Sequence, residues 1–175
     1  MSDRNDTRRA ECASELVVRP ATAADAAAIA TVYNDAVLTS TATFDLETED
    51  AAARARWLAA DSTRLCLVAE LDGRLVGWTA LTRWSARKGY RETAELAIYV
   101  AADRRRSGVG LALAGAALRA APALGLHAVI AQICAENDAG LALAAGLGLK
   151  PVGTLREVGS KFGRRLDVVL CERLV

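Results

Sequence analysis

The stretch RRRSGVG, Arg104–Gly110, sets three arginines directly before two closely spaced glycines. An apolar, strand-like run precedes it, and an alanine-rich, helix-like run follows it. A strand, a tight turn and a helix N-terminus together form an anion site, because free backbone N–H groups point at the ligand. Gly108 and Gly110 favour such a turn, since glycine adopts positive φ and lets a ligand approach the backbone. The stretch therefore predicts a phosphate site, for either a nucleic acid or a small cofactor.

The overall charge separates these two ligands. The 175-residue chain has 22 basic and 21 acidic residues, which gives a net charge of +1. Nucleic-acid binders carry a marked basic excess or a basic face, so we predict a small cofactor and no nucleic-acid partner. A single histidine, His127, and the lack of any C-x-x-C pair disfavour a zinc site. We therefore predict no metal.

Cysteine usage and hydropathy indicate the compartment. Cys66, Cys134 and Cys171 lie in apolar runs, as buried free thiols do, which fits a reducing cytosol. The longest apolar region, residues 111–133, is interrupted by Arg119 and Pro122 and predicts a helix followed by a strand. We expect a cytoplasmic protein with no secretory signal and no membrane partner.

Hydrophobic periodicity predicts a single α/β domain over residues 16–175, after a mobile polar tail at residues 1–15. Asp72-Gly73 between two apolar runs predicts a hairpin, and Thr22 with Asp25 predicts a helix start. The order β-α-α-β-β-β-α-β-α-β-β implies one mixed sheet with helices on both faces. The expected strands are 16–20, 64–71, 74–84, 93–100, 127–134, 149–159 and 164–174, and the expected helices are 22–37, 48–61, 109–121 and 138–148.

The glycine-rich stretch matches R-x-x-G-x-G through Arg105, Gly108 and Gly110. It lacks the lysine of a Walker A loop, and Leu113 stands where a dinucleotide fingerprint has its third glycine. It resembles the pyrophosphate loop of the GCN5-related N-acetyltransferases. The resemblance extends over Leu16–Leu174, most closely to the branch with phosphinothricin, methionine sulfoximine and methionine N-acetyltransferases.

That resemblance implies the family's α/β fold (α+β in some schemes). The sheet would be mostly antiparallel, with about six or seven strands, a splayed strand pair and about four flanking helices. It implies acetyl-CoA as co-substrate and a homodimer. The implied cofactor-binding residues are Ile98, Tyr99, Val100, Arg105, Arg106, Ser107, Gly108, Val109, Gly110, Leu111 and Asn137.

The resemblance places the family's strand glutamate at Glu95. An ammonium has no lone pair, so a carboxylate that removes its proton, directly or through water, would promote attack on the thioester. Glu92 and Glu136 are the reserve acids. The alternative is that Glu95 faces solvent or pairs with an arginine.

The acceptor is expected to be a small amino acid or analogue. Its carboxylate would pair with arginines in the segment before the strand of Glu95, because a guanidinium binds carboxylates in a bidentate manner. The candidate substrate-binding residues are Phe44, Arg83, Arg87, Arg91 and Glu136. Two alternatives stay open: another amine as acceptor (an antibiotic, a polyamine or a protein N-terminus), or a CoA-binding module without catalysis.

The chain departs from the family at four positions. Leu149 stands where relatives have tyrosine or phenylalanine, so a tyrosine that protonates the leaving thiolate is missing there. Gly140 replaces a frequent serine next to the cofactor. Ser85 and Arg165 replace a basic residue and a tryptophan of some relatives, which leaves the acceptor open. The remaining tyrosines are Tyr33, Tyr90 and Tyr99.

Overall fold

A computed structural model describes residues 15–175. The expected N-terminal tail therefore lies outside the described residues, except for Glu15. The order of strands and helices is the predicted one, and four short 3-10 turns lie between these elements, at Ala23–Asp25, Lys88–Tyr90, Ala102–Arg104 and Pro122–Leu124. The strands are β1 (Leu16–Pro20), β2 (Thr63–Leu71), β3 (Arg74–Arg83), β4 (Thr93–Val100), β5 (Ala128–Cys134), β6 (Lys150–Lys161) and β7 (Arg164–Leu174).

The seven strands form one sheet in the order β1-β2-β3-β4-β5-β7-β6. Every neighbouring pair is antiparallel except β4 and β5, which confirms the expected mixed, mostly antiparallel sheet. Both tight hairpins have positive φ at two central residues, at Asp72-Gly73 and at Phe162-Gly163. Such turns follow the right-handed twist of the strands that they join.

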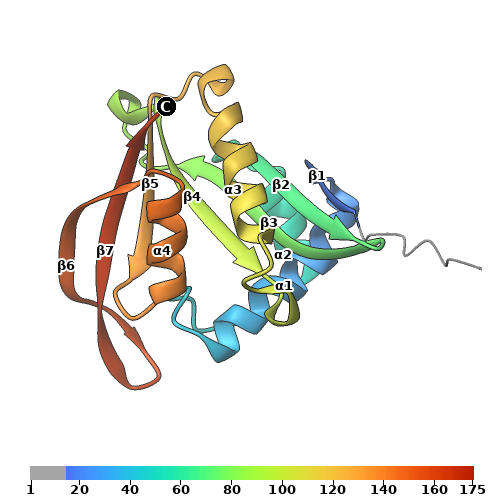
Figure 1. Cartoon of the computed structure of the whole chain (residues 1–175), viewed down its shortest axis with the longest axis horizontal. Helices are drawn as coiled ribbons and strands as arrows, with labels where there is room; N and C mark the ends of the chain where they lie inside the picture. The colour runs from blue at the N-terminus through green and yellow to red at the C-terminus, as the bar shows by residue number, and fades with distance from the viewer. Residues whose placement is uncertain (1–14) are drawn as a thin grey trace, which may run out of the picture.

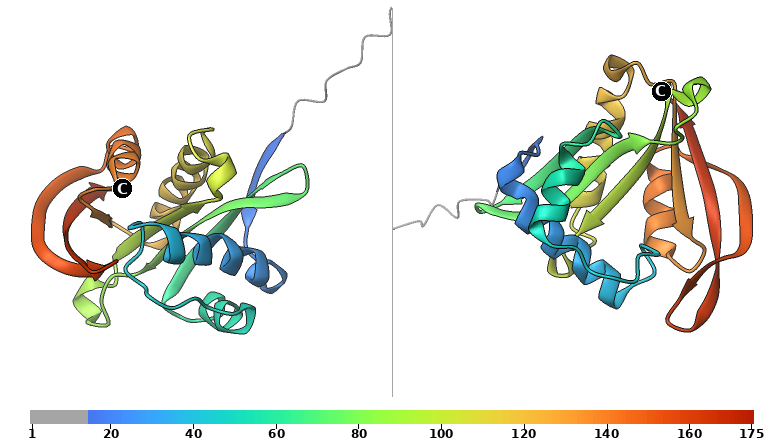
Figure 2. Two further views of the ribbon diagram at one scale, coloured as in Figure 1. Left: turned by 90° about the horizontal axis from the view of Figure 1, so that it is seen from below. Right: turned by 180° about the vertical axis from the view of Figure 1, so that it is seen from behind.

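Four α-helices cover the two faces of the sheet (Figures 1 and 2). α3 (Val109–Ala120) and α4 (Asp138–Gly146) lie on one face, and α1 (Ala26–Thr39) and α2 (Ala51–Leu58) lie on the other. Each pair of helices covers its own apolar core. The first is rich in leucine and alanine, and the second contains Tyr33 and Trp78.

The parallel pairing of β4 with β5 is short. It joins only Thr93–Glu95 to Ala128–Ile130, whereas β3 stays paired with β4 as far as Val100. β5 meanwhile stays paired with β7 as far as Cys134. β4 and β5 therefore diverge after Glu95 and Ile130, as Figure 1 shows below their labels. This is the expected splayed strand pair, and it opens a gap in the middle of the sheet.

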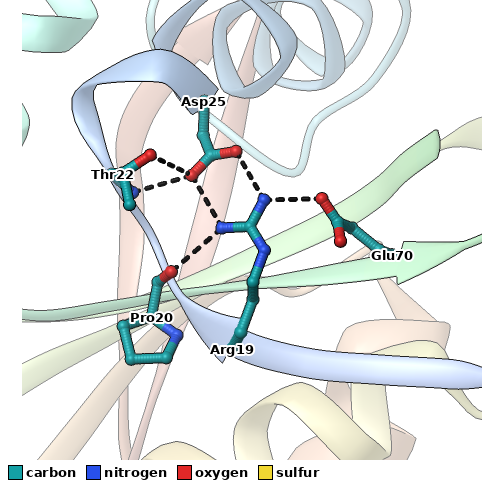
Figure 3. Close-up of polar contacts among 5 residues, drawn as sticks. All are labelled: Arg19, Pro20, Thr22, Asp25 and Glu70. Carbon is teal, nitrogen blue, oxygen red and sulfur yellow. Dashed lines mark hydrogen bonds and ion pairs between the residues drawn. The ribbon is translucent and has the colours of Figure 1, made fainter. Parts of the chain in front are cut away.

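A charged cluster fixes the N-terminal strand to the rest of the sheet (Figure 3). Arg19 on β1 donates two hydrogen bonds to the Asp25 carboxylate, at 2.9 and 2.8 Å, and one to Glu70 on β2. Asp25 also accepts the Thr22 backbone N–H at 2.7 Å, which is one half of the predicted helix-start motif. The Arg19 guanidinium beside it holds the pKa of Asp25 well below its usual range, despite burial.

Asp25→Asn is expected to lower the free energy of unfolding at pH 7 by about 1–3 kcal/mol, because a bidentate charged pair is lost. The folded-state pKa of Asp25 is depressed, so its stabilisation is complete above the unfolded pKa of about 3.9 and is lost as the pH falls toward the folded value. Urea unfolding measures this. The difference in the free energy of unfolding between wild type and Asp25→Asn should be smaller at pH 3 than at pH 7 by about 1 kcal/mol.

The matched control is Glu70→Gln. The Glu70 side chain is 31% exposed, compared with 11% for Asp25, and an exposed pair contributes less than about 1 kcal/mol. Two results would contradict this account of the cluster. One is an equal loss of unfolding free energy in Asp25→Asn and Glu70→Gln. The other is a difference in unfolding free energy between wild type and Asp25→Asn that is the same at pH 3 and pH 7.

Candidate active site

The gap between β4 and β5 leads into two adjoining hollows. We call the larger one the outer groove. It has a volume of about 460 Å3 and runs from the Arg105–Leu111 loop past β4 to the start of α4. The smaller one, the inner cavity, has a volume of about 130 Å3 and lies between β4, β5 and α4. Six residues line both hollows, which makes them continuous: Ala42, Ile98, Tyr99, Asn137, Gly140 and Leu143.

The predicted phosphate loop forms one end of the outer groove. Arg106 and Gly108 both have positive φ, at 62° and 86°, and α3 begins at the next residue. Left-handed residues that alternate with others turn successive N–H groups toward one point, which makes an anion-binding nest. The N-terminus of α3 adds its partial positive charge there. The loop therefore fits a pyrophosphate, as the sequence predicts.

The loop side chains have different surroundings. Arg105, Arg106, Gly108, Gly110 and Leu111 line the outer groove. Arg105 also donates to Asp35 of α1 at 3.0 Å and to the Val100 carbonyl at 3.2 Å, so it connects the loop to α1 and β4. The predicted Ser107 and Val109 do not line either hollow. The Ser107 hydroxyl bonds the Arg104 carbonyl, and Val109 is buried in the core beneath α3.

Glu95 lies where the β4–β5 pairing ends, and it lines the inner cavity. Its carboxylate accepts a hydrogen bond of 2.9 Å from Gln132 on β5. Its partner in the sheet register is Thr82, and alternation places Glu95 and Tyr99 on the face of α1 and α2. Leu96 and Ile98 face α3 and α4 instead. The carboxylate is thus held across the gap by a neutral amide, not by an arginine.

Tyr99 lines both hollows. Its ring packs edge-on against Tyr33, with 4.9 Å between ring centres, and its hydroxyl lies 3.5 Å from the Ala42 carbonyl. Burial raises the pKa of Tyr99 to about 12, so its hydroxyl stays protonated at neutral pH. Leu149 is buried in the wall of the inner cavity, so an aliphatic group occupies the position for which the family resemblance implies an aromatic ring.

Asn137 begins α4 at the edge of both hollows. Its side-chain oxygen accepts the Gly140 N–H at 3.0 Å, which is a helix N-cap. A Cβ atom at position 140 would lie 2.6 Å from the Asn137 amide nitrogen. The Gly140 departure is therefore compatible with this cap, and a serine there would push the Asn137 side chain away.

The loop between α1 and α2, residues 40–50, lies against the outer groove, and we call it the groove-lining loop. Several distant elements hold it in place. Ser40, Thr41 and Ala42 line the outer groove. The Thr43 hydroxyl lies 3.0 Å from the Tyr33 hydroxyl, and the Thr43 carbonyl accepts a 2.7 Å bond from Lys161 of β6. Lys161 is only 3% exposed, and burial lowers the pKa of its amine.

Phe44 takes part in this anchoring and does not line either hollow. Its ring lies so close to Gly159 of β6 that a Cβ atom at that position would be 2.1 Å away. Gly159 follows a bulge in β6, where the register with β7 shifts between Leu155 and Gly159. The β6–β7 hairpin thus holds the loop through one buried amine and one aromatic contact.

The three predicted substrate arginines do not come together in the hollows. Arg83 pairs with Asp61, and its register partner is Ala94, so alternation places it on the face opposite Glu95. Arg87 is exposed, and Arg91 pairs with its neighbour Glu92 at 2.9 Å. Glu136 does line the outer groove, where it pairs with Arg164.

Gln132, Lys161 and the Ala42 segment were absent from the sequence-based site. These residues contact the site through the tertiary fold, and no local motif indicates them. Gln132 is 37 residues from Glu95 in the sequence, and Lys161 is 118 residues from Thr43. Within residues 15–175, we find no group of three or more side chains that could hold a metal. Nor is any helix in this range long and apolar enough to cross a membrane.

Comparison with known proteins gives a consistent result. Residues 29–149 match the acetyltransferase (GNAT) family. The chain is 34% identical over 158 residues to an L-methionine sulfoximine/L-methionine sulfone acetyltransferase of Pseudomonas paraeruginosa, covering 89% of this chain and 92% of that protein. It is 36% identical over 161 residues to a phosphinothricin N-acetyltransferase of Streptomyces viridochromogenes, with coverages of 89% and 86%. A crystal structure of a GNAT superfamily phosphinothricin acetyltransferase from Sinorhizobium meliloti with acetyl-CoA gives a TM-score of 0.87 at 28% identity, covering 91% and 88%.

Lys161→Met is expected to loosen the groove-lining loop, because the buried Thr43 carbonyl loses its donor. A lost hydrogen bond to a charged group corresponds to about 1.5 kcal/mol, so amide hydrogen exchange over residues 41–46 should become roughly tenfold faster. Mass spectrometry of exchange measures this. Lys150→Met, at the exposed start of the same strand, is the control. Unchanged exchange in Lys161→Met would show that this contact does not hold the loop.

Proposed function

The chain belongs to the acetyltransferase (GNAT) family, and we propose that it transfers the acetyl group of acetyl-CoA to the α-amine of a small amino acid or amino-acid analogue. The observation that carries this proposal is the continuous hollow between β4 and β5. It has an anion nest at one end and a carboxylate, Glu95, at the other. The relatives named for methionine sulfoximine and phosphinothricin support the acceptor class.

The outer groove fits the co-substrate acetyl-CoA. When bound, acetyl-CoA supplies the thioester that the amine attacks. The Arg105–Leu111 loop holds its pyrophosphate with backbone N–H groups and arginine side chains. Ile98, Tyr99 and Val100 offer backbone groups on the edge of β4 that faces the gap, because this edge has no strand partner beyond Glu95. Asn137 contacts the pantetheine arm from the start of α4.

Glu95 acts as the base in this proposal. The amine enters from the α1–α2 face, where alternation places the Glu95 carboxylate, and loses its proton to that carboxylate directly or through water. Gln132 fixes the carboxylate orientation through its 2.9 Å hydrogen bond. Backbone N–H groups of β4 that point into the gap stabilise the negative charge that develops on the carbonyl oxygen.

The thiolate leaves without a side-chain acid in this proposal and equilibrates with solvent protons afterwards, because a thiolate whose conjugate acid has a pKa of about 8.5 is a good leaving group. Leu149 has no proton to give. Burial raises the pKa of Tyr99 to about 12, which makes its hydroxyl a weak acid. Tyr99 instead packs against the groove-lining loop and shapes the wall of the cavity.

We propose that the acceptor carboxylate is bound at the entrance on the Glu95 side. Arg87 is the first candidate, because it is exposed in the segment that leads into β4. Arg91 is exposed in the same segment but would first have to leave Glu92. Arg83 would first have to leave Asp61, and Glu136 would have to leave Arg164. Phe44 contributes by shaping the loop that closes the groove.

The test is acetyl-CoA turnover, followed by thiol release, on methionine sulfoximine, phosphinothricin, methionine and a set of cationic amines. Turnover is expected on at least one amino acid or analogue. Glu95→Gln should lower kcat by about 10²–10⁴ because the base is lost, whereas the Kd for acetyl-CoA should change little. Glu172→Gln is the control, since Glu172 is exposed on β7 and does not line either hollow.

Three other results would contradict parts of this proposal. Turnover on cationic amines alone would contradict the proposed acceptor. Cofactor binding without turnover on any amine would favour a CoA-binding module. Equal losses in Glu95→Gln and Glu172→Gln would contradict the assignment of Glu95 as the base.

We propose further that residues 16–175 are one domain in a cytoplasmic protein. The single continuous sheet supports the domain. The compartment is supported by three buried free thiols, Cys66, Cys134 and Cys171, because thiols stay reduced in the cytosol.

The proposed homodimer would form through β6. This strand lies at the edge of the sheet and exposes large apolar side chains, with Val152 at 55%, Leu155 at 41% and Val158 at 59%. An unpaired edge strand that is long and apolar invites pairing with another chain. A second copy would satisfy the backbone groups and cover the side chains together.

Val152→Lys combined with Val158→Lys is expected to convert a dimer into a monomer, because burying two unpaired charges at an interface is costly. Sedimentation velocity of wild type and variant measures this. Val17→Lys with Leu38→Lys is the matched control, since these apolar side chains are also exposed and lie on β1 and α1. A monomeric wild type, or dissociation in the control alone, would contradict the β6 interface.

A further inference from the structure

A single side-chain hydrogen bond spans the gap between β4 and β5 among the described residues. Glu95 on β4 accepts it from the side-chain nitrogen of Gln132 on β5, at 2.9 Å. An ionised carboxylate can only accept hydrogen bonds, so Gln132 has to present its amide nitrogen to Glu95 and not its oxygen. The chemistry of Glu95 therefore fixes which way round the Gln132 carboxamide lies.

This arrangement leaves two oxygen atoms unpartnered. Within residues 15–175, the second Glu95 oxygen and the Gln132 carboxamide oxygen accept no hydrogen bond from another residue. Both residues line the inner cavity, and alternation places both on the α1–α2 face. Ala131 and Ile133, the neighbours of Gln132, pack in the core of the opposite face. The pair therefore offers a ligand two acceptors, one from each strand that borders the gap.

Two acceptors on either side of a gap suit a nitrogen that carries two hydrogen atoms. A neutral primary amine has two N–H groups and one lone pair. When one N–H points at Glu95 and the other at Gln132, the lone pair is directed away from both residues and is free to attack a carbonyl carbon. An N-methylated amine has one N–H only and cannot satisfy both oxygens.

We propose that Gln132 binds the acceptor amine through its carboxamide oxygen and thereby selects primary amines over N-methylated ones. This inference rests on the proposed N-acetyltransferase function. The amine nitrogen bonds to the acetyl carbonyl carbon, and the carbon–sulfur bond breaks as the thiolate of CoA leaves. The proton on the Glu95 side goes to that carboxylate, directly or through water. The hydrogen on the Gln132 side stays and becomes the N–H of the product amide.

The size of the selectivity follows from what N-methylation changes. It removes one of the two hydrogen bonds and puts a methyl group against the Gln132 oxygen. A single extra methylene that a site excludes already costs about 10–200-fold, and a missing N–H that the site is built to bind costs more. With the best amine of the panel, we expect kcat/KM to exceed that of its α-N-methyl derivative by more than about tenfold.

Two variants separate amine binding from the positioning of Glu95. Gln132→Ala removes the carboxamide and leaves room for a methyl group, and Gln132→Met removes the hydrogen bonds at nearly the same length. Both free the Glu95 carboxylate, which lowers kcat for the primary and the N-methyl amine alike. Only a contact with the amine changes the ratio of the two kcat/KM values. This ratio should fall at least fivefold in Gln132→Ala and at least twofold in Gln132→Met.

The matched control is Thr82→Val. Thr82 is the register partner of Glu95 on β3, the strand that stays paired, and it does not line either hollow. Its substitution removes a polar group beside Glu95 at constant size, on the side away from the gap. The ratio in Thr82→Val should stay within twofold of the wild-type ratio. A fall as large as that in the Gln132 variants would overturn the inference.

Calorimetric titration of the amine into the protein with CoA gives a readout apart from turnover. In Gln132→Met, the Kd of the primary amine should rise at least threefold, because a hydrogen bond from a charged donor is lost, and the Kd of the N-methyl amine should change less than twofold. A primary-amine Kd that rises less than threefold would overturn the inference.

Thermal unfolding identifies the variants that fold, and Gln132→Met supplies the ratio if Gln132→Ala does not fold. A wild-type ratio of tenfold or less would overturn the inference and leave the acetyltransferase function intact. A ratio that falls less than fivefold in folded Gln132→Ala would do the same. Failure of the wild type to acetylate any amine would reject the proposed function, and this inference with it.

Discussion

The early end of the parallel pairing between β4 and β5 is the constraint on which the site depends. Only Thr93–Glu95 pair with Ala128–Ile130. Beyond that point each strand keeps its antiparallel partner on the outer side, so the separation costs hydrogen bonds along one edge only. Those free edges line the groove, and the chain can leave them unpaired because a ligand or water satisfies them. The phosphate loop, the start of α4 and Glu95 all border the same gap.

The features that short-range chemistry determines were predictable from the sequence. The turn with positive φ before α3, the Asp72-Gly73 hairpin and the order of strands and helices all follow from local preferences, and the structure confirms them. The surroundings of the acceptor were not predictable. Arg83 was assigned from its position in the sequence, but the β3–β4 register places it opposite Ala94 and not opposite Glu95. A shift of one residue in register decides the face, and periodicity alone does not fix it.

The conformation of the groove-lining loop was likewise not predictable from local sequence. Its residues 40–50 have no regular structure, and their conformation depends on Lys161, Tyr33 and Tyr99 from three separate elements. The buried amine of Lys161 is the least expected of these, since lysine is rarely fully buried. It is 118 residues from its partner Thr43. The C-terminal hairpin therefore belongs to the site, although no motif in it indicates so.

The buried thiols of this fold have a use as reporters of local opening. Burial raises the pKa of Cys66 to about 12, so its reactive thiolate is nearly absent at neutral pH. Cys66 lies on β2, Cys134 at the end of β5 and Cys171 on β7. These positions flank the gap on both sides. The chain has a fourth cysteine, Cys12. In a variant with Cys12 replaced, the labelling rate of each remaining thiol measures how often its own part of the sheet exposes its interior. A comparison of these labelling rates would thus show whether the two halves of the sheet open together or separately.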